Sequence, residues 1–137
     1  MKQILGEQGE VEFWRVRIRQ GKPLAFGALG GALFFGLPGN PVSAAVTFEL
    51  FGRPAIRRML GAAQLERPLV EVTLEGAEQR RVDRRQFVRV RLASRAGRLI
   101  ARVTGEQDSH LISSLQGATA LLVVPEGEGV IRPGELA

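Results

Sequence analysis

The sequence has no cysteine and no tyrosine, and it contains a single histidine, His110. Without cysteine the chain has no disulfide bond, no thiolate metal site and no thiol nucleophile. With one histidine, a histidine-based metal site would need carboxylates or a second chain, and no metal-binding residues are predicted. No apolar run approaches the ~18 residues of a membrane-spanning helix, and the first ten residues lack the apolar core of a signal peptide. The protein is therefore predicted to be cytoplasmic.

Acidic residues are outnumbered by basic ones, almost all of which are arginine. The 137 residues are 45% hydrophobic and 24% charged, with 19 Lys and Arg against 14 Asp and Glu. This composition is typical of a globular protein and excludes extended disorder. Eight basic and four acidic residues lie in residues 1–62, against eleven and ten in residues 63–137. Four of the eight basic residues in residues 1–62 are Arg15, Arg17, Arg19 and Lys22. The short segment of residues 15–22 is therefore a candidate anion site.

The hydrophobic pattern changes near residue 62 and predicts two domains, residues 1–62 and 63–137. The first is predicted to be α/β, with strands at residues 11–18, 24–26 and 32–35 followed by a helix from Pro41. The apolar run at 32–35 is typical of a buried strand in a parallel sheet. Pro54 is expected to break the helix, and one or two further turns are expected to end at Gly61. Trp14, Phe34, Phe35 and Phe48 are predicted to be core residues.

Short alternating segments in residues 63–137 predict a small β-barrel or sandwich. Strands are expected at residues 69–74, 87–92, 99–103 and 120–124, with a short helical turn at 109–115. Alternation in the second strand directs Val88 and Val90 inward and Arg89 and Arg91 outward. Ala96-Gly97 is a hairpin signal between the second and third strands.

A turn rich in glycine and proline joins the apolar strand to the helix of the first domain, and it reads Gly36-Leu37-Pro38-Gly39-Asn40-Pro41. Asn40 as the N-cap residue and Pro41 at the first helical position predict the start of the helix. Such a turn directs backbone N–H groups and the positive end of the helix dipole to one point, where anions bind. The alternative is a βα turn whose glycines and prolines only fix the geometry. The Walker and dinucleotide-binding fingerprints are absent.

Five segments resemble the molybdopterin molybdenumtransferase family, which is MoeA in bacteria and the E domain of gephyrin in animals. They are residues 19–27, 36–44, 47–50, 108–115 and 124–127, in the order and spacing of the family. The resemblance implies a partial molybdopterin-binding three-layer α/β unit followed by a small C-terminal β-barrel. It also implies that the complete enzyme inserts molybdate into adenylylated molybdopterin and releases AMP and the molybdenum cofactor.

The resemblance further implies which residues bind substrate. Pro38 and Pro41 match prolines that line the molybdopterin pocket, and Arg15 and Arg19 stand where the family has basic residues near phosphate and molybdate. Ser109 matches a serine of the C-terminal domain that faces the cleft. Guanidinium groups suit phosphate and molybdate oxygens because they donate paired hydrogen bonds. The expected substrate-binding residues are Arg15, Arg19, Lys22, Pro38, Gly39, Asn40, Pro41 and Ser109.

The resemblance implies that the earlier half of the α/β domain and the two domains before it have no counterpart in the sequence. In the family, these missing parts supply the acidic residues that bind Mg²⁺ and act in catalysis. The sequence is therefore expected to be a fragment or a separately encoded C-terminal piece that is inactive alone, with a separate chain supplying the other half. The complete family member is expected to be a homodimer. Apolar residues between 24 and 35 are expected to keep an uncovered face and to cause self-association.

A nucleic-acid-binding β-barrel is the alternative function. In that interpretation Arg89, Arg91 and the arginines of residues 80–85 contact phosphates. Phe87 is the one aromatic residue available for base stacking on these strands, which disfavours this alternative.

Overall fold

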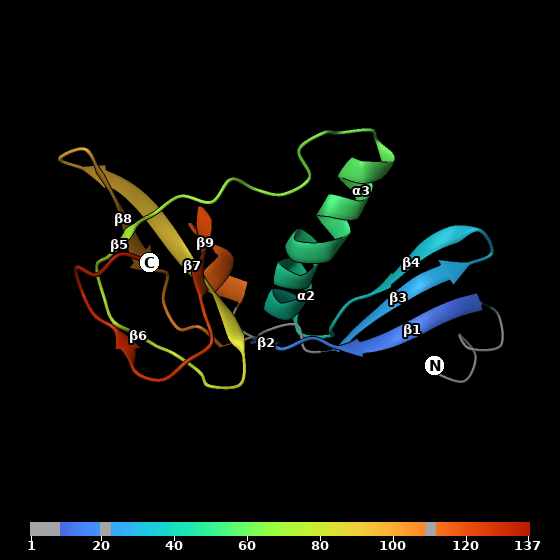
Figure 1. Cartoon of the computed structure of the whole chain (residues 1–137), viewed down its shortest axis with the longest axis horizontal. Coiled ribbons are helices and arrows are strands. Elements are labelled where there is room, and N and C mark those ends of the chain that lie inside the picture. Colours follow the sequence, from blue (N-terminus) through green and yellow to red (C-terminus); the bar gives the residue numbers. More distant parts are fainter. Residues whose placement is uncertain (1–8, 20–22, 109–111) are drawn as a thin grey trace.

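The computed structural model describes residues 9–19, 23–108 and 112–137 of the chain. Over these residues it is a mixed α/β protein in which strands predominate. Figure 1 shows a three-stranded sheet at one end, a larger sheet at the other and a helical segment between them. None of the described helices has the length and apolar character needed to span a bilayer.

The first sheet is an antiparallel meander. Strand β3 (Pro23–Leu29) lies between β1 (Gly9–Arg15) and β4 (Ala32–Gly36) and pairs antiparallel with both. The prediction of a buried parallel strand at residues 32–35 is therefore wrong, and Ala32 and Leu33 are exposed. The physical reason is the connection, because Gly30 and Gly31 make a two-residue turn with φ of 57° and 80°. A parallel pair would need a crossover of a dozen or more residues, and glycine adopts this left-handed backbone without strain.

The predicted strand at residues 11–18 is divided between two sheets. Strand β1 ends at Arg15, and the chain then enters β2 (Ile18–Arg19). This strand pairs in parallel with β7 of the second sheet, with Ile18 opposite Arg85 and Arg19 opposite Gln86. A strand of the first predicted domain thus belongs to the sheet of the second.

A continuous helical segment follows β4, made of α2 (Pro41–Thr47), the π-helix η1 (Phe48–Gly52) and α3 (Arg53–Met59). The predicted helix start is confirmed, with Asn40 in an extended conformation and Pro41 in the first turn. Pro54 does not break the helix, because it falls in the first turn of α3 after the wider π-helical turn. Gly61, with φ of 75°, follows the end of α3 as predicted.

Strand β7 (Arg85–Arg95) is the centre of the second sheet. It pairs antiparallel with β8 (Arg98–Val103) and β9 (Ala120–Val124), and β5 (Thr73–Leu74) pairs in parallel with β8. The predicted strand at residues 69–74 is reduced to β5. The predicted hairpin is confirmed, with positive φ at both Ala96 and Gly97. The remaining elements are the strands β6 (Glu78–Gln79) and β10 (Val130–Ile131), which pair with each other, and the 3-10 helix η2 (Ile112–Leu115).

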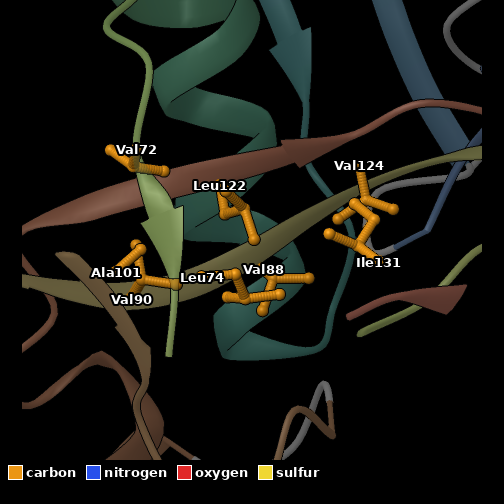
Figure 2. Packing of buried hydrophobic residues seen from close by; sticks show 8 residues of the cluster. All are labelled: Val72, Leu74, Val88, Val90, Ala101, Leu122, Val124 and Ile131. Carbon is orange, nitrogen blue, oxygen red and sulfur yellow. The ribbon is translucent and has the colours of Figure 1, made fainter. Parts of the chain in front are cut away.

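The main hydrophobic core lies in this second part of the chain, as Figure 2 shows. Val72, which precedes β5, meets inward-facing residues of β5, β7, β8, β9 and β10 there: Leu74, Val88, Val90, Ala101, Leu122, Val124 and Ile131. Burial of Val88 and Val90 confirms the predicted inner face of β7.

The aromatic residues predicted to form a core in the first part are less buried than expected. Phe34 and Phe35 are half-buried. Phe48 is 43% exposed, so its prediction as a core residue is wrong. The side chain of Trp14 lies outside the described part of the chain.

Candidate functional site

The turn between β4 and α2 is open to solvent. Pro38 is half-buried, and Gly39, Asn40 and Pro41 are exposed. The carbonyl oxygen of Asn40 accepts the hydrogen bond from the Ala44 N–H at 2.8 Å, which begins the helix. A Cβ built on Gly39 would meet no atom within 4 Å. The turn therefore has free space beside it, as the anion-site interpretation requires.

Arg19 is held at the junction of the two parts of the chain. It is half-buried on β2, and its Nη1 donates a hydrogen bond to Oε1 of Gln86 at 3.0 Å. Gln86 is 1% exposed, and its Nε2 donates to the carbonyl oxygen of Gln79 at 2.6 Å. The strand pairing of β2 with β7 thus places Arg19 against a buried amide of the second part. No sequence pattern pointed to Gln86, because its partner is 67 residues away.

Arg89 is fully buried, although alternation along β7 directs it to solvent. Its Nη2 donates to the carbonyl oxygens of Glu106 at 3.2 Å and Asp108 at 3.4 Å. The prediction of an outward Arg89 is wrong because the loop of residues 104–108 folds over this face of β7. Hydrogen bonds attach the loop to the backbone of Arg89. The Arg89 N–H donates to Oε1 of Gln107 at 2.9 Å, and the Thr104 N–H donates to the carbonyl oxygen of Arg89 at 3.0 Å.

The ionisation of buried Arg89 depends on burial and on the charges around it. Burial lowers the pKa of Arg89, and the charge of Arg19 lowers it further, while Asp108 has the opposite effect. Burial also raises the pKa of the Glu78 carboxyl, although the charges of Arg19 and Arg81 oppose this shift. The charge of Arg19 on β2 therefore acts on two ionisable groups of the second part, the Arg89 guanidinium and the Glu78 carboxyl.

Several predicted site residues fall outside the part of the chain that is described. These are Lys22, Ser109 and the side chain of Arg15. Their positions relative to Arg19, and the closeness of Arg19 to the turn before α2, stay predictions. Among residues 9–19, 23–108 and 112–137, no three His, Asp or Glu side chains gather as metal ligands.

An apolar groove of about 370 Å³ lies between the first sheet and the helical segment. Its lining residues are Val16, Leu24, Phe26, Phe35, Phe51 and Ala55. The rings of Phe26 and Phe35 pack with centroids 4.9 Å apart, yet Phe26 is 40% exposed. Leu33 on β4 is 47% exposed. The expected uncovered apolar face of residues 24–35 is thus seen at Phe26 and Leu33, whereas Leu24 and Ala25 are buried. The expected self-association stays a prediction.

Comparisons with known proteins match both parts of the chain. Residues 1–58 match the family profile described as probable molybdopterin binding domain, and residues 71–137 match the MoeA C-terminal region (domain IV). A molybdopterin molybdenumtransferase of Haemophilus influenzae is 35% identical over 139 residues, covering 98% of this chain and 34% of the relative. Gephyrin of Dictyostelium discoideum is 34% identical over 160 residues, and the match covers 99% of this chain and 22% of gephyrin.

A solved structure has the same arrangement. The molybdopterin biosynthesis MoeA protein of Pyrococcus horikoshii OT3 superimposes with a TM-score of 0.75 at 30% identity. The match covers 93% of this chain and 31% of that one. The chain thus spans about a third of the length of the bacterial relative and of this structure.

Proposed function

The chain belongs to the molybdopterin molybdenumtransferase family, and from that premise we propose that it is part of a larger enzyme of molybdenum cofactor biosynthesis. That enzyme inserts molybdate into adenylylated molybdopterin and releases AMP and the molybdenum cofactor. The observation that carries the proposal is the position of Arg19, which lies on β2 at its junction with β7 and is held there by a 3.0 Å hydrogen bond to Gln86. A guanidinium group favours an oxyanion such as phosphate or molybdate.

Two domains, residues 1–62 and 63–137, make up this proposed part. The first corresponds to the later half of the molybdopterin-binding three-layer unit, and the second to the small C-terminal β-barrel. Support comes from the family matches, which end at residue 58 and resume at residue 71. The connecting segment is held to the helices, since Arg57 Nε donates to the carbonyl oxygen of Gln64 at 2.8 Å.

The proposed substrate site lies where the first domain meets the second. Arg19 binds the oxyanion together with Arg15 and Lys22, and the backbone of the turn before α2 receives the terminal phosphate. Pro38 and Pro41 flank the pterin. The remaining members of the proposed site are Gly39, Asn40 and Ser109. Within the described residues the acidic side chains do not gather into a Mg²⁺ site.

The apolar groove defines the proposed partner. Its lining of aliphatic and aromatic side chains suits an apolar surface rather than the charged substrate. We infer that it is covered by the half of the molybdopterin-binding domain for which this chain has no counterpart, supplied by a separate chain. The complete assembly is proposed to be a homodimer.

The nucleic-acid alternative has no support from the comparisons. In addition, Arg89 is not available on the basic face which that alternative requires, because it is buried against the loop of residues 104–108.

Reconstitution tests the proposed function. This chain is mixed with a polypeptide carrying the remaining part of the Haemophilus influenzae relative, and gel filtration verifies that a complex forms. AMP released from adenylylated molybdopterin is then measured after molybdate is added. We expect release from the complex and none from either part alone. A complex that releases no AMP, or equal release without this chain, would contradict the proposal.

A further inference from the structure

Gln86 is a buried amide whose two ends both have partners. It is one of the largest fully buried side chains in the described part of the chain. Its Oε1 accepts the 3.0 Å hydrogen bond from Arg19, and its Nε2 donates the 2.6 Å hydrogen bond to Gln79. Buried polar groups that are satisfied in this way fix the geometry of their neighbours.

Its neighbours determine which way the amide of Gln86 points. Turning the amide over would place its oxygen against the Gln79 carbonyl oxygen and its NH₂ group against the Arg19 guanidinium. Both contacts would then be repulsive, because each would join two acceptors or two donors. The oxygen of Gln86 is therefore held toward Arg19.

We propose that Gln86 is a positioning residue that orients the Arg19 guanidinium for an oxyanion without neutralising its charge. This inference rests on the proposed function, in which Arg19 binds the oxyanion. Strand pairing fixes the backbone positions of the two residues, because Arg19 lies opposite Gln86 in the parallel pairing of β2 with β7.

The neutrality of the amide matters as much as its position. A carboxylate here would also accept a hydrogen bond from Arg19, but it would compensate the positive charge. The oxyanion would then compete with an internal partner for the same donors. A neutral acceptor holds the Arg19 guanidinium through Nη1 and adds no further negative charge beside it to that of the Glu78 carboxyl, on which the Arg19 charge already acts.

Two substitutions in the 137-residue chain separate these effects. Gln86→Met keeps the length of the side chain and removes the acceptor, and Gln86→Glu keeps an acceptor and adds a charge. Isothermal titration calorimetry with inorganic phosphate measures binding, and urea unfolding measures stability. Side-chain NMR of the Arg19 guanidinium, assigned with Arg19→Lys, reports its restraint independently of binding. Gln116→Met changes an exposed glutamine in the same chemical way and serves as the control.

We expect Gln86→Met to weaken phosphate binding by roughly fivefold and to free the rotation of the Arg19 guanidinium. Gln86→Glu is expected to restrain Arg19 and still to weaken phosphate binding, a combination that a merely structural role would not produce. Gln116→Met is expected to bind as the wild type does.

The proposal is overturned if a folded Gln86→Met binds phosphate as tightly as the wild type. If Gln86→Met does not fold, Gln86→Glu decides, and wild-type affinity in that variant overturns the proposal. Failure of the proposed oxyanion site looks different, because the wild-type chain itself would then bind no phosphate while the NMR signal of Arg19 would still respond to Gln86→Met.

Discussion

Arg89 donates from Nη2 to the carbonyl oxygen of Glu106 at 3.2 Å, from a position on β7 that alternation assigns to solvent. The loop of residues 104–108 covers this position, so the guanidinium is enclosed between the sheet and the loop. Two backbone carbonyl groups of the loop are its acceptors. These hydrogen bonds hold the charged side chain of Arg89 in the interior of the protein.

Substitution of Arg89 by Met is expected to destabilise the fold by roughly 2–4 kcal/mol, because the carbonyl groups of Glu106 and Asp108 lose a buried donor. Urea unfolding followed by circular dichroism measures the change. Arg98→Met, at an exposed position of the β8 hairpin, is the control and is expected to change stability by less than about 0.5 kcal/mol. Equal stability of both variants would show that Arg89 is not a structural anchor.

Gly36 and Gly39 occupy the same turn but differ in the space beside them. A Cβ on Gly36 would lie 2.8 Å from the Cβ of Ala25, whereas one on Gly39 would meet no atom within 4 Å. We expect Gly36→Ala to cost roughly 1–3 kcal/mol through overpacking and Gly39→Ala to stay within about 0.5 kcal/mol. Thermal unfolding of the two variants side by side makes the comparison, and a larger loss for Gly39→Ala would count against the described packing.

Glu78 gives a pH dependence with a definite sign. Burial raises the pKa of its carboxyl in the folded state above the ordinary 4.5. The folded state therefore holds this proton more tightly, and the resulting stabilisation is present below the unfolded pKa and lost as the pH rises through the folded pKa. We expect Glu78→Gln to be more stable than the wild type near pH 7, with a smaller difference near pH 4.

Urea unfolding at both pH values checks the prediction for Glu78. Glu128→Gln, at an exposed carboxylate, measures the general effect of removing one negative charge. A difference between Glu78→Gln and the wild type that grows toward low pH would contradict the assigned direction.

The local signals of the sequence predicted several elements correctly. Asn40 and Pro41 mark the start of α2, and Ala96-Gly97 marks the hairpin between β7 and β8, because a cap and a tight turn depend on residues that are adjacent in the chain. The strand predicted at residues 120–124 is β9. The family resemblance, carried by short motifs of this kind, is likewise confirmed.

Features that depend on distant pairing were not predictable in this way. The chain between β1 and β2 changes sheets because Ile18 and Arg19 find partners on β7, and nothing local to residues 11–18 signals that partner. The burial of Arg89 depends on a loop 15 to 19 residues further along the chain. Arg19 was named from the sequence and lies at the junction of β2 with β7, Arg89 was named but assigned to solvent, and Gln86 was found only from the structure. The cytoplasmic location and the homodimer stay predictions.

The apolar groove predicts self-association of the chain in the absence of its proposed partner. We expect the wild type to sediment above the monomer mass at high concentration and Phe26→Ser to shift it toward the monomer, because Phe26 exposes much of its ring at the groove. Analytical ultracentrifugation over a range of concentrations measures both. Ile56→Ser, at an apolar residue of α3 that is also exposed but does not line the groove, is the control. A wild type that stays monomeric throughout would contradict this use of the groove.

Phosphate binding to the whole chain, compared between the wild type and Arg19→Ala by isothermal titration calorimetry, tests the proposed oxyanion site most directly. The wild type is expected to bind weakly, with an affinity that falls as salt is added because the attraction is largely electrostatic. Arg19→Ala is expected to lose roughly tenfold in affinity with its fold intact, and Arg132→Ala, an exposed arginine of the second part, to lose little. Equal phosphate affinity of Arg19→Ala and the wild type would contradict the proposed site.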